Sequence, residues 1–468
     1  MMVKLAVFVL MNGLVFGGAA LVARHGLKFR ERMAVGLATV LLGWITIVFG
    51  LEALGLFGLI RLLPALGLAA CGFATGIVCW GRDRGSEAKS EVIGASQAGL
   101  SHPPDVPRAD VKAPSRSRSP RWSALIAVSL AVWAAVDVLI VGLCSPVQPV
   151  SDAPIYHLYF SVRWWQSGRL EIVPTPFGES AAPYFPANAS VWFTWLVLPW
   201  DSEILAKVGQ WPFLIVGMLA IYALVCELGV RRVIAVFPAV LWGTGTIPLI
   251  NSGFADVDLV MAAWYLVATW FLVRYSRRHQ VADLACSSLA AGAALGTKYI
   301  AVLFVPWLIL ASVFLAWRSP NRWMHWGVIV IGVAAPSAFW FVRNAVLTGN
   351  PLYPLHVEIL GFPILNGWYS RETLLRTSGY HIPVSDWASL VLILLRNMDP
   401  ILVPLWLAGV IAAVWSTTKK TWLPWLLVVL GLLHIVLFWV VNPYQTQDRF
   451  LFAAMALLAV PVAILLDR

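Results

Sequence analysis

Charged residues are scarce in this chain of 468 residues, since Asp, Glu, Lys and Arg together make up only 12% of it. Hydrophobic residues make up 60%. An ordinary soluble domain carries about 25% charged and roughly 45–50% apolar residues. Because no water-soluble core could bury this much apolar side chain, the composition excludes a soluble fold for most of the chain and indicates helices embedded in a membrane.

Cysteine is also rare, and its pattern excludes two common kinds of small scaffold. All five cysteines lie in or at the ends of apolar segments, and no two of them form a CxxC pair. The histidines form no HxxH or HxxE arrangement. The sequence therefore predicts neither a disulfide framework nor a zinc site.

The formal net charge of +10 does not indicate a nucleic-acid partner, because the basic residues occur in short clusters between apolar runs. Such clusters are typical of cytoplasmic loops in membrane proteins. Many of the 25 tryptophans lie near the ends of apolar runs, as expected for an aromatic belt at the membrane interface. The expected partners are therefore membrane lipids and no nucleic acid.

The apolar runs predict an all-α, polytopic transmembrane bundle of about 12–14 spans. We expect thirteen spans, over residues 3–23, 34–51, 58–80, 122–144, 204–228, 233–249, 257–275, 282–297, 299–317, 325–346, 400–416, 421–441 and 449–466. The stretch 188–200 is apolar but short and ends near Pro199. It is compatible with a membrane-dipping helix or with a further span.

Three regions follow from the composition along the chain. Residues 1–81 form a three-helix transmembrane segment, and residues 122–468 form the main bundle. Between them, residues 82–121 are rich in Ser, Pro, Ala and charge, and contain no aromatic residue. Because such a segment cannot bury enough apolar surface to fold, we expect it to be a flexible cytoplasmic linker.

The basic clusters divide the loops between two sides of the membrane. With the spans above, the Lys and Arg clusters all fall on one side, which the positive-inside rule makes cytoplasmic. The opposite, extracytoplasmic side then receives the loops 145–203, 251–258, 347–399 and 442–449. These loops carry most of the polar residues found at segment ends, so we expect the chemistry on that side.

The first large outer loop places an acid at the mouth of a helix. If residues 154–166 are helical, Asp152 lies at the helix N-terminus, and aromatic residues recur along one face in an amphipathic pattern. Asp152 could be a catalytic group. The alternative is a simple N-cap, a role worth about 1 kcal/mol.

Several pieces of the sequence, in this order, resemble landmarks of a known family. They are Asp152 with Tyr156, His157, Trp164 and Trp165; the proline-rich PYFPANASVWF; FADVDLVMAAWYL with Asp256 and Asp258; ALGTKY ending at Tyr299; RNAVLTGNPLYP from Arg343 to Pro354; and QDRFLF from Gln447 to Phe452. Residues 122–468 thus resemble the GT-C superfamily of polyprenyl-phosphate-sugar-dependent glycosyltransferases, which includes protein O-mannosyltransferases and the aminoarabinose transferases of lipid A. Residues 1–121 fall outside the resemblance.

The resemblance implies a GT-C fold and a membrane glycosyltransferase at the outer face of a bacterial-type inner (plasma) membrane. The donor would be a polyprenyl-phosphate sugar, and the acceptor a hydroxyl of an unknown protein, lipid or glycan. Asp152 would be the general base, because the family's catalytic acid lies at this loop start. Transfer in a single displacement would invert the anomeric configuration.

Two further acids and a histidine are candidate catalytic residues. Asp256 and Asp258 open the span at 257–275, where they could bind hydroxyls of the substrates or cap the helix. His157 could assist the base or hold a sugar hydroxyl, although a histidine in an aromatic helix is commonly packed and hydrogen-bonded. No metal ligands are assigned, and a divalent cation bridging Asp152 and Asp256 stays open.

Four cations lie on the expected outer side, where the positive-inside rule does not place them. They are Arg163, Lys298, Arg343 and Arg449, and Tyr353 follows Arg343 in the same landmark. We expect these residues to bind the donor phosphate or the substrate. The alternatives are contacts with lipid headgroups or pairing with a carboxylate.

Two other classes of function remain open from the sequence. A transporter or flippase of lipid-linked or small polar substrates would place polar groups in broken helices at the membrane midplane, whereas most apolar runs here are uninterrupted. A non-catalytic scaffold with the same fold would have lost the geometry between Asp152 and the outer cations.

Overall fold

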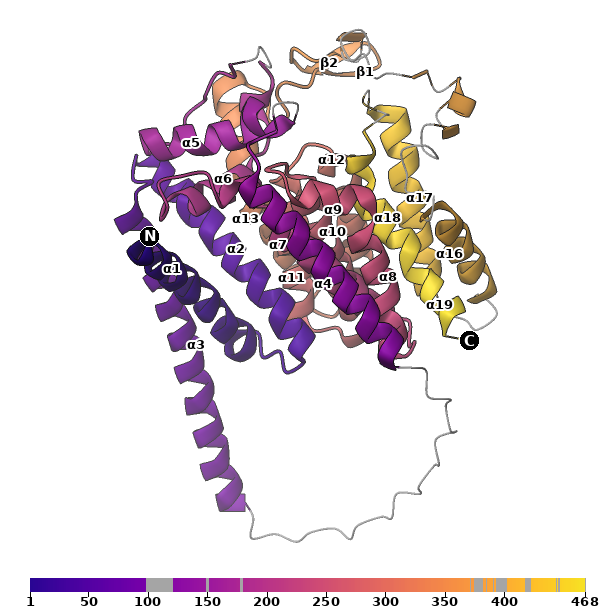
Figure 1. The fold of residues 1–468 in the computed structure, drawn as a ribbon. Helices are drawn as coiled ribbons and strands as arrows, with labels where there is room; N and C mark the ends of the chain where they lie inside the picture. The colour runs from indigo at the N-terminus through magenta and orange to yellow at the C-terminus, as the bar shows by residue number, and fades with distance from the viewer. Residues whose placement is uncertain are drawn as a thin grey trace.

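The computed structural model describes residues 1–97, 121–148, 151–176, 180–370, 402–416, 422–442 and 447–467, with residues 372–373, 382–383, 385–389, 391–392 and 444. Nearly all of the described secondary structure is helical, which confirms an all-α fold (Figure 1). Within these ranges, the only strands are β1 (Val357–Ile359) and β2 (Phe362–Leu365), which form a small antiparallel hairpin.

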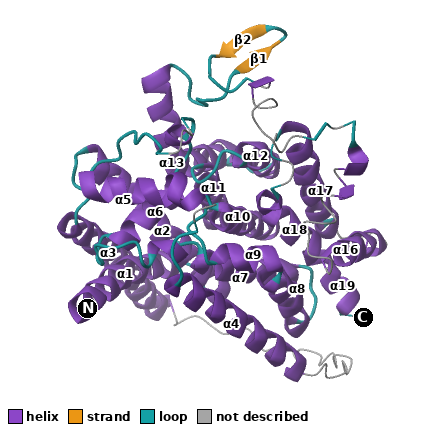
Figure 2. Ribbon diagram, turned by 45° about the horizontal axis from the view of Figure 1, so that its top comes forward, coloured by secondary structure: helices purple, strands orange, loops and turns teal. Residues whose placement is uncertain are grey.

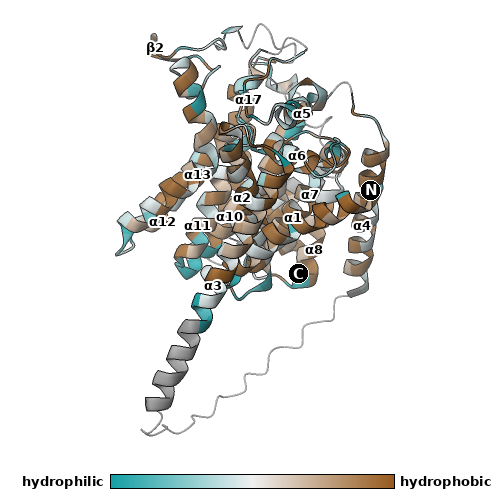
Figure 3. Ribbon diagram, turned by 90° about the vertical axis from the view of Figure 1, so that its left-hand side faces the viewer, coloured by the Kyte–Doolittle hydropathy of each residue, from teal (hydrophilic) through white to brown (hydrophobic). Residues whose placement is uncertain are grey.

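The helices follow the apolar runs of the sequence, because a backbone in lipid must satisfy its hydrogen bonds within its own segment. They are α1 (Met2–Leu21), α2 (Arg32–Leu56), α3 (Leu62–Gln97), α4 (Arg121–Cys144), α5 (Leu158–Ser167), α6 (Asn188–Val197), α7 (Trp211–Glu227), α8 (Arg232–Thr244), α9 (Thr246–Ser252), α10 (Asp258–Arg278), α11 (Val281–Leu295), α12 (Ala301–Trp317), α13 (Arg322–Thr348), α16 (Leu402–Ser416), α17 (Leu423–Val441), α18 (Phe452–Ala459) and α19 (Ala463–Leu466). Hydrophobic residues fill the middle of most helices, and hydrophilic residues gather at ends such as those of α3 and α12 (Figure 3).

Nine helices in the described part of the chain are long and apolar enough to cross a membrane, or ten if α8 and α9 form one bent span. The protein is therefore an integral membrane protein that crosses the bilayer several times. The expectation of about thirteen spans is too high by this measure. Helices α11, α12 and α16 are described over 15, 17 and 15 residues, fewer than the roughly 20 that a straight span needs.

Helix α10 is the central helix of the bundle. Its residues are buried without interruption from Asp258 to Tyr275. It packs against α7, α11, α12 and α18, which surround it in Figure 2. Because α10 is apolar on every side, it can only be stable with neighbours all around it. Its first residue, the candidate acid Asp258, is therefore held in a rigid frame, and Asp256 lies two positions before it.

The N-terminal helices pack directly on the main bundle. The Trp44 ring of α2 lies 5.1 Å from the Trp264 ring of α10 and 6.2 Å from the Phe213 ring of α7. Helix α3 continues to Gln97, so residues 82–97 of the expected linker 82–121 are helical. A polar composition does not exclude a helix, because helix propensity does not depend on an apolar face. Residues 98–120 lie outside the described ranges.

The helix in the apolar stretch 188–200 is too short to span a membrane. This helix, α6, has ten residues, all buried inside the protein. Asn188 is the first residue of α6. Its side-chain amide donates to the carbonyl of Pro336 at 2.6 Å and accepts from the indole of Trp340 at 2.5 Å, so it ties the start of α6 to α13. Gly296 lies so close to Asn188 that a Cβ at Gly296 would clash with the amide nitrogen. This contact fixes the turn that precedes Lys298.

Helices α8 and α9 are separated by a bend of 66° at Gly245. The bend ends the expected span 233–249 early and leads the chain through α9 to the start of α10. Helix α4 lies against α8 and α9. Over most of its length α4 is exposed, since only 11% of its most apolar stretch is buried inside the protein.

Candidate functional site

Three acids and two cations from distant parts of the chain meet at the end of the bundle where α10 begins. Arg449 joins two of the acids, because Nη2 lies 2.6 Å from Oδ2 of Asp152 and Nη1 lies 3.0 Å from Oδ2 of Asp256. Lys298 Nζ lies 2.6 Å from Oδ1 of Asp258. Arg449 Nη1 also lies 3.8 Å from Oδ2 of Asp258. We call these five residues the acid cluster.

Three members of the acid cluster lie in turns next to a helix, whereas Asp258 is the first residue of α10. Asp152 precedes the π-helical turn Ala153–His157, and its side chain makes no capping hydrogen bond there. Lys298 lies in the turn between α11 and α12, and Arg449 lies in the 3-10 turn Asp448–Leu451 that leads into α18. The alternative that Asp152 is only an N-cap is therefore not supported by its side-chain contacts.

The three acids differ in exposure. The side chain of Asp152 is 21% exposed, that of Asp256 is 4% exposed and that of Asp258 is fully buried. Lys298 and Arg449 contact the acids directly, and the Phe450 ring lies 4.2 Å from Lys298 Nζ. Asp152 is thus the acid most accessible to a reacting group.

The pKa values of Asp152 and Asp256 are shifted in opposite directions. Burial raises the pKa of Asp152, but the charges of Arg449 and Lys298 outweigh it, and a hydrogen bond with Tyr156 adds to them, so the net pKa lies below its usual value. Burial raises the pKa of Asp256 to about 7, although Arg449 opposes the shift. At neutral pH Asp152 is therefore ionised, whereas Asp256 is divided between its two forms.

Several buried polar atoms of the acid cluster have no hydrogen-bond partner within the described residues. They are Oδ1 of Asp256, Oδ2 of Asp258 and Nε of Arg449. A buried polar group without a partner costs about 1–3 kcal/mol. Native proteins keep few such groups, and the group of three here is what a site shaped for a polar ligand would contain.

His157 lies behind the acid cluster and is buried. Its Nδ1 lies 3.3 Å from the Ser190 hydroxyl, its ring lies 4.2 Å from that of Tyr156, and its Nε2 has no partner among the described residues. Burial lowers the pKa of His157 to about 3, so the ring is neutral at physiological pH. His157 fixes the turn that carries Asp152 to α6 and makes no hydrogen bond with an acid of the cluster.

Arg343 and Tyr353 belong to a second group of polar residues. Arg343 donates to the carbonyl of Pro183 at 2.8 Å and lies over the Trp340 ring. The backbone carbonyl of Tyr353 accepts hydrogen bonds from the Tyr299 hydroxyl and from Asn344. Since Tyr299 follows Lys298 in the chain, this second group adjoins the acid cluster without joining it.

Arg163 lies outside both groups. It is exposed on α5, and its guanidinium donates to the side chain of Gln166 at 3.1 Å. Of the nine candidate residues, the structure therefore joins Asp152, Asp256, Asp258, Lys298 and Arg449 in one cluster, and places His157, Arg343, Tyr353 and Arg163 elsewhere.

Arg449 occupies the place between Asp152 and Asp256 where a bridging divalent cation would bind. Its two terminal nitrogens each contact one carboxylate. Among the residues described, no group of three or more His, Cys, Asp or Glu side chains has an arrangement that could hold a metal ion.

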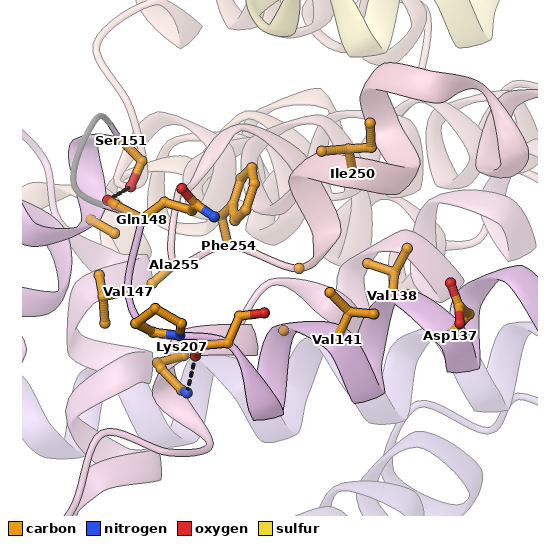
Figure 4. A pocket seen from close by; sticks show the side chains of 15 residues that line it. Asp137, Val138, Val141, Val147, Gln148, Ser151, Lys207, Ile250, Phe254 and Ala255 are labelled. Atoms are coloured by element: carbon orange, nitrogen blue, oxygen red, sulfur yellow. Dashed lines mark hydrogen bonds between the residues drawn. The ribbon is translucent and has the colours of Figure 1, made fainter.

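An open cavity of about 240 Å³ lies beside the acid cluster (Figure 4). We call it the α4/α9 groove, because Val138 and Val141 of α4 form one wall and Ile250 of α9 with Phe254 forms the other. Lys207 lies at one end and Asp137 at the other (Figure 4). Ser151 and Ala153, on either side of Asp152, and Ala255, which precedes Asp256, also line the groove.

Sequence reasoning missed several residues near these sites. Glu52 of α2 is 4% exposed and close enough to Arg343 for their charges to interact. Asp137 interrupts the apolar run of α4 and is exposed. Both are charges within or at the end of an apolar run, and that signal could have identified them. Asn188, which fits a glycosylation sequon, is fully buried and therefore inaccessible to glycosylation in the folded protein.

No family model matches the chain, and neither a curated protein nor a solved structure does. The chain is an integral membrane protein with several spans, and its function has to be inferred from the geometry above.

Proposed function

We propose that the protein is a glycosyltransferase that moves a sugar from a polyprenyl-phosphate donor to an acceptor hydroxyl. The observation that carries the proposal is the acid cluster, in which Arg449 joins Asp152 to Asp256 beside an open groove. Such a transfer needs a base for the acceptor proton and cations for the departing phosphate. Both are present within one constellation.

Asp152 is the general base in this proposal. It is ionised at neutral pH and is the most exposed of the three acids. Its low pKa makes it a weak base while Arg449 holds it. A donor phosphate that draws Arg449 toward itself removes this stabilisation and raises the pKa of Asp152, so the base becomes effective when the donor is bound.

The reaction is a single displacement. The acceptor oxygen attacks the anomeric carbon while its proton passes to Asp152. The bond between the anomeric carbon and the phosphate oxygen breaks, and the electron pair leaves on the polyprenyl phosphate. Arg449 and Lys298 stabilise the charge that develops on this phosphate. The product has the opposite anomeric configuration, and the proton on Asp152 returns to water.

The membrane orientation belongs to the same proposal. The basic clusters of the loops favour the cytoplasm for the end of the bundle opposite to the acid cluster. The acid cluster then lies at the extracytoplasmic face, and the resemblance to GT-C enzymes supports a bacterial-type plasma membrane as the location. The acceptor is a hydroxyl of a protein, a lipid or a glycan that reaches this face.

A transfer assay tests the function. Membranes that contain the wild type or Asp152→Asn, at equal protein level, are incubated with radiolabelled polyprenyl-phosphate sugars, and label in any acceptor is measured. We expect transfer by the wild type, loss in the variant by about 10²–10⁴-fold, and inversion in the product. Equal transfer by both proteins, or retention of configuration, would reject the role of Asp152.

A transporter of polar substrates is the second candidate. It is favoured by the 66° break between α8 and α9 and by Asp137, a charge inside the apolar run of α4. Uptake of a radiolabelled lipid-linked or small polar substrate into proteoliposomes, abolished by Asp137→Asn but unaffected by Asp152→Asn, would support transport over transfer.

A further inference from the structure

The α4/α9 groove combines an apolar wall with a cation at one end. Valine side chains of α4 face Ile250 and Phe254 across it (Figure 4). At its floor the chains approach closely, because a Cβ on Gly142 would lie 2.9 Å from the carbonyl oxygen of Gly253. From Asp137 to Ser145 the groove follows α4 for roughly 12 Å, at a rise of 1.5 Å per residue.

Lys207 is held at the end of the groove with part of its hydrogen-bonding capacity unused. Its ammonium donates to the backbone carbonyls of Leu143 at 3.0 Å and Ser145 at 2.7 Å. None of the described carboxylates forms an ion pair with it. Because an ammonium has three donors, one remains for a ligand. Capping the last turn of α4 explains the two backbone bonds, but not why a cation borders an apolar groove.

The Lys207 end of the groove is also the end next to the acid cluster. Ser151 and Ala153, which line the groove, are the sequence neighbours of Asp152, and Ala255, which also lines it, precedes Asp256. A ligand whose head lay at Lys207 would therefore have that head beside the proposed base, while its chain extended along α4. Since α4 is largely exposed, such a chain can enter from the bilayer.

We propose that the α4/α9 groove binds the phosphate and the first part of the hydrocarbon chain of an anionic prenyl lipid, with Lys207 on the phosphate. This inference rests on the proposed function, because it names where the donor lies. Asp137 at the far end sets the direction, since an anionic head there would meet a like charge. Lys207 acts in binding, whereas Arg449 and Lys298 act on the departing phosphate.

Photolabelling tests the site directly. The purified protein in lipid nanodiscs is labelled with a photoactivatable farnesyl phosphate, and labelled peptides are mapped. We expect label on α4 and on the segment 246–255, with competition by unlabelled farnesyl phosphate. Farnesol or inorganic phosphate at the same concentration should compete about tenfold less, because each lacks one half of the ligand. Equal competition by inorganic phosphate would identify free phosphate as the ligand and overturn the proposal.

Matched variants separate the groove from the surrounding surface. Val141→Trp fills the groove and should reduce labelling about tenfold. Ile140→Trp, the neighbouring position, which does not line the groove and is 55% exposed, should leave labelling unchanged. If Val141→Trp does not fold, Ile250→Trp fills the groove from the other wall. Unchanged labelling in the filled variant would overturn the proposal.

The charge is tested at Lys207. Lys207→Met should weaken farnesyl phosphate binding about tenfold, whereas Lys207→Arg should retain most of it. In a transfer assay the loss should fall on KM more than on kcat, which a purely structural cap would not produce. Equal labelling and equal KM in Lys207→Met would contradict the assignment.

The groove and the proposed function can fail separately. If the wild type transfers sugar and Val141→Trp transfers equally well, the groove is wrong and the function stands. If labelling follows the expectations above but no labelled donor is ever used, the groove stands as a lipid site and the glycosyltransferase proposal fails.

Discussion

Two clusters of charged residues lie at opposite ends of α10, and they are built differently. The acid cluster at its start has three carboxylates for two cations, and three of its buried polar atoms have no hydrogen-bond partner among the described residues, against one, Oδ2 of Asp283, at the other end. The cluster at its other end, which we call the arginine cluster, pairs Arg274 with Asp283 and Glu31, and Arg278 with Glu31. The acid cluster has one carboxylate more than it has cations, whereas the arginine cluster has two acids for two arginines.

Their surroundings differ in the same sense. Arg274 is 2% exposed, and its guanidinium lies over the Trp270 ring at 4.9 Å. The arginine cluster joins Glu31, which precedes α2, to α10 and α11, so it holds the N-terminal helices to the bundle. The acid cluster instead adjoins an open groove. We infer that excess charge beside a cavity marks the site of chemistry, and that balanced charge between helices is structural.

Arg449→Met should produce the largest effect on the acid cluster. Loss of the guanidinium that meets the departing phosphate should lower kcat about 10²–10³-fold. Because Arg449 lowers the pKa of Asp152, its removal should also move the acid limb of the pH profile to higher pH. The measurement is the pH dependence of transfer. An unmoved acid limb would contradict the coupling, and Arg449→Lys, which keeps the charge, should show a smaller shift.

Arg274→Met should affect stability and leave the chemistry unchanged. It leaves Asp283 buried without its partner, which should cost about 3–5 kcal/mol. The midpoint of thermal unfolding in detergent should fall, while transfer per folded molecule stays at the wild-type value. The double variant Arg274→Met with Asp283→Asn should recover part of the loss. A fall in transfer per folded molecule would remove the distinction between the clusters.

Asp256→Asn tests the acid that is half-protonated at neutral pH. Its folded pKa of about 7 lies above the usual value near 4, so its contribution to stability is fully present below about pH 4 and is lost as the pH rises through 7. The amide cannot ionise, so the variant should lose less stability than the wild type between pH 4 and 8. Parallel curves of unfolding midpoint against pH would contradict the raised pKa.

Arg163→Ala should have the smallest effect. The side chain is exposed and contacts only Gln166 among the described residues, so transfer should stay within about twofold of the wild type. Rates of transfer at saturating and at low donor concentration would check this. A larger loss would place Arg163 in the donor site and extend the functional region along α5.

The sequence predicted which segments are helical better than it predicted whether each helix is surrounded by protein or by lipid. Runs such as 34–51 and 325–346 are helical because lipid leaves no other way to satisfy the backbone. Composition could not separate α6, which is buried in protein, from a segment buried in lipid, because both are apolar. It also could not show that the helix α3 continues through polar residues to Gln97.

The sequence identified the residues of the candidate site but could not show which of them contact one another. Asp152, Asp256 and Arg449 stood out as polar residues at the ends of apolar runs. No spacing in the sequence relates Asp152 to Arg449, which lie 297 positions apart, and only the folding of the chain brings them together. Lys207 was missed because it lies near the start of the expected span 204–228, at the membrane interface, where a lysine is common.

The most direct test compares one acid from each cluster in the same assay. Wild type, Asp152→Asn and Asp283→Asn are purified into nanodiscs, and transfer of label from polyprenyl-phosphate sugars is measured per folded molecule. We predict that Asp152→Asn loses about 10²–10⁴-fold and that Asp283→Asn transfers like the wild type. Full activity in Asp152→Asn, or an equal loss in both variants, would contradict the assignment of the acid cluster as the site of chemistry.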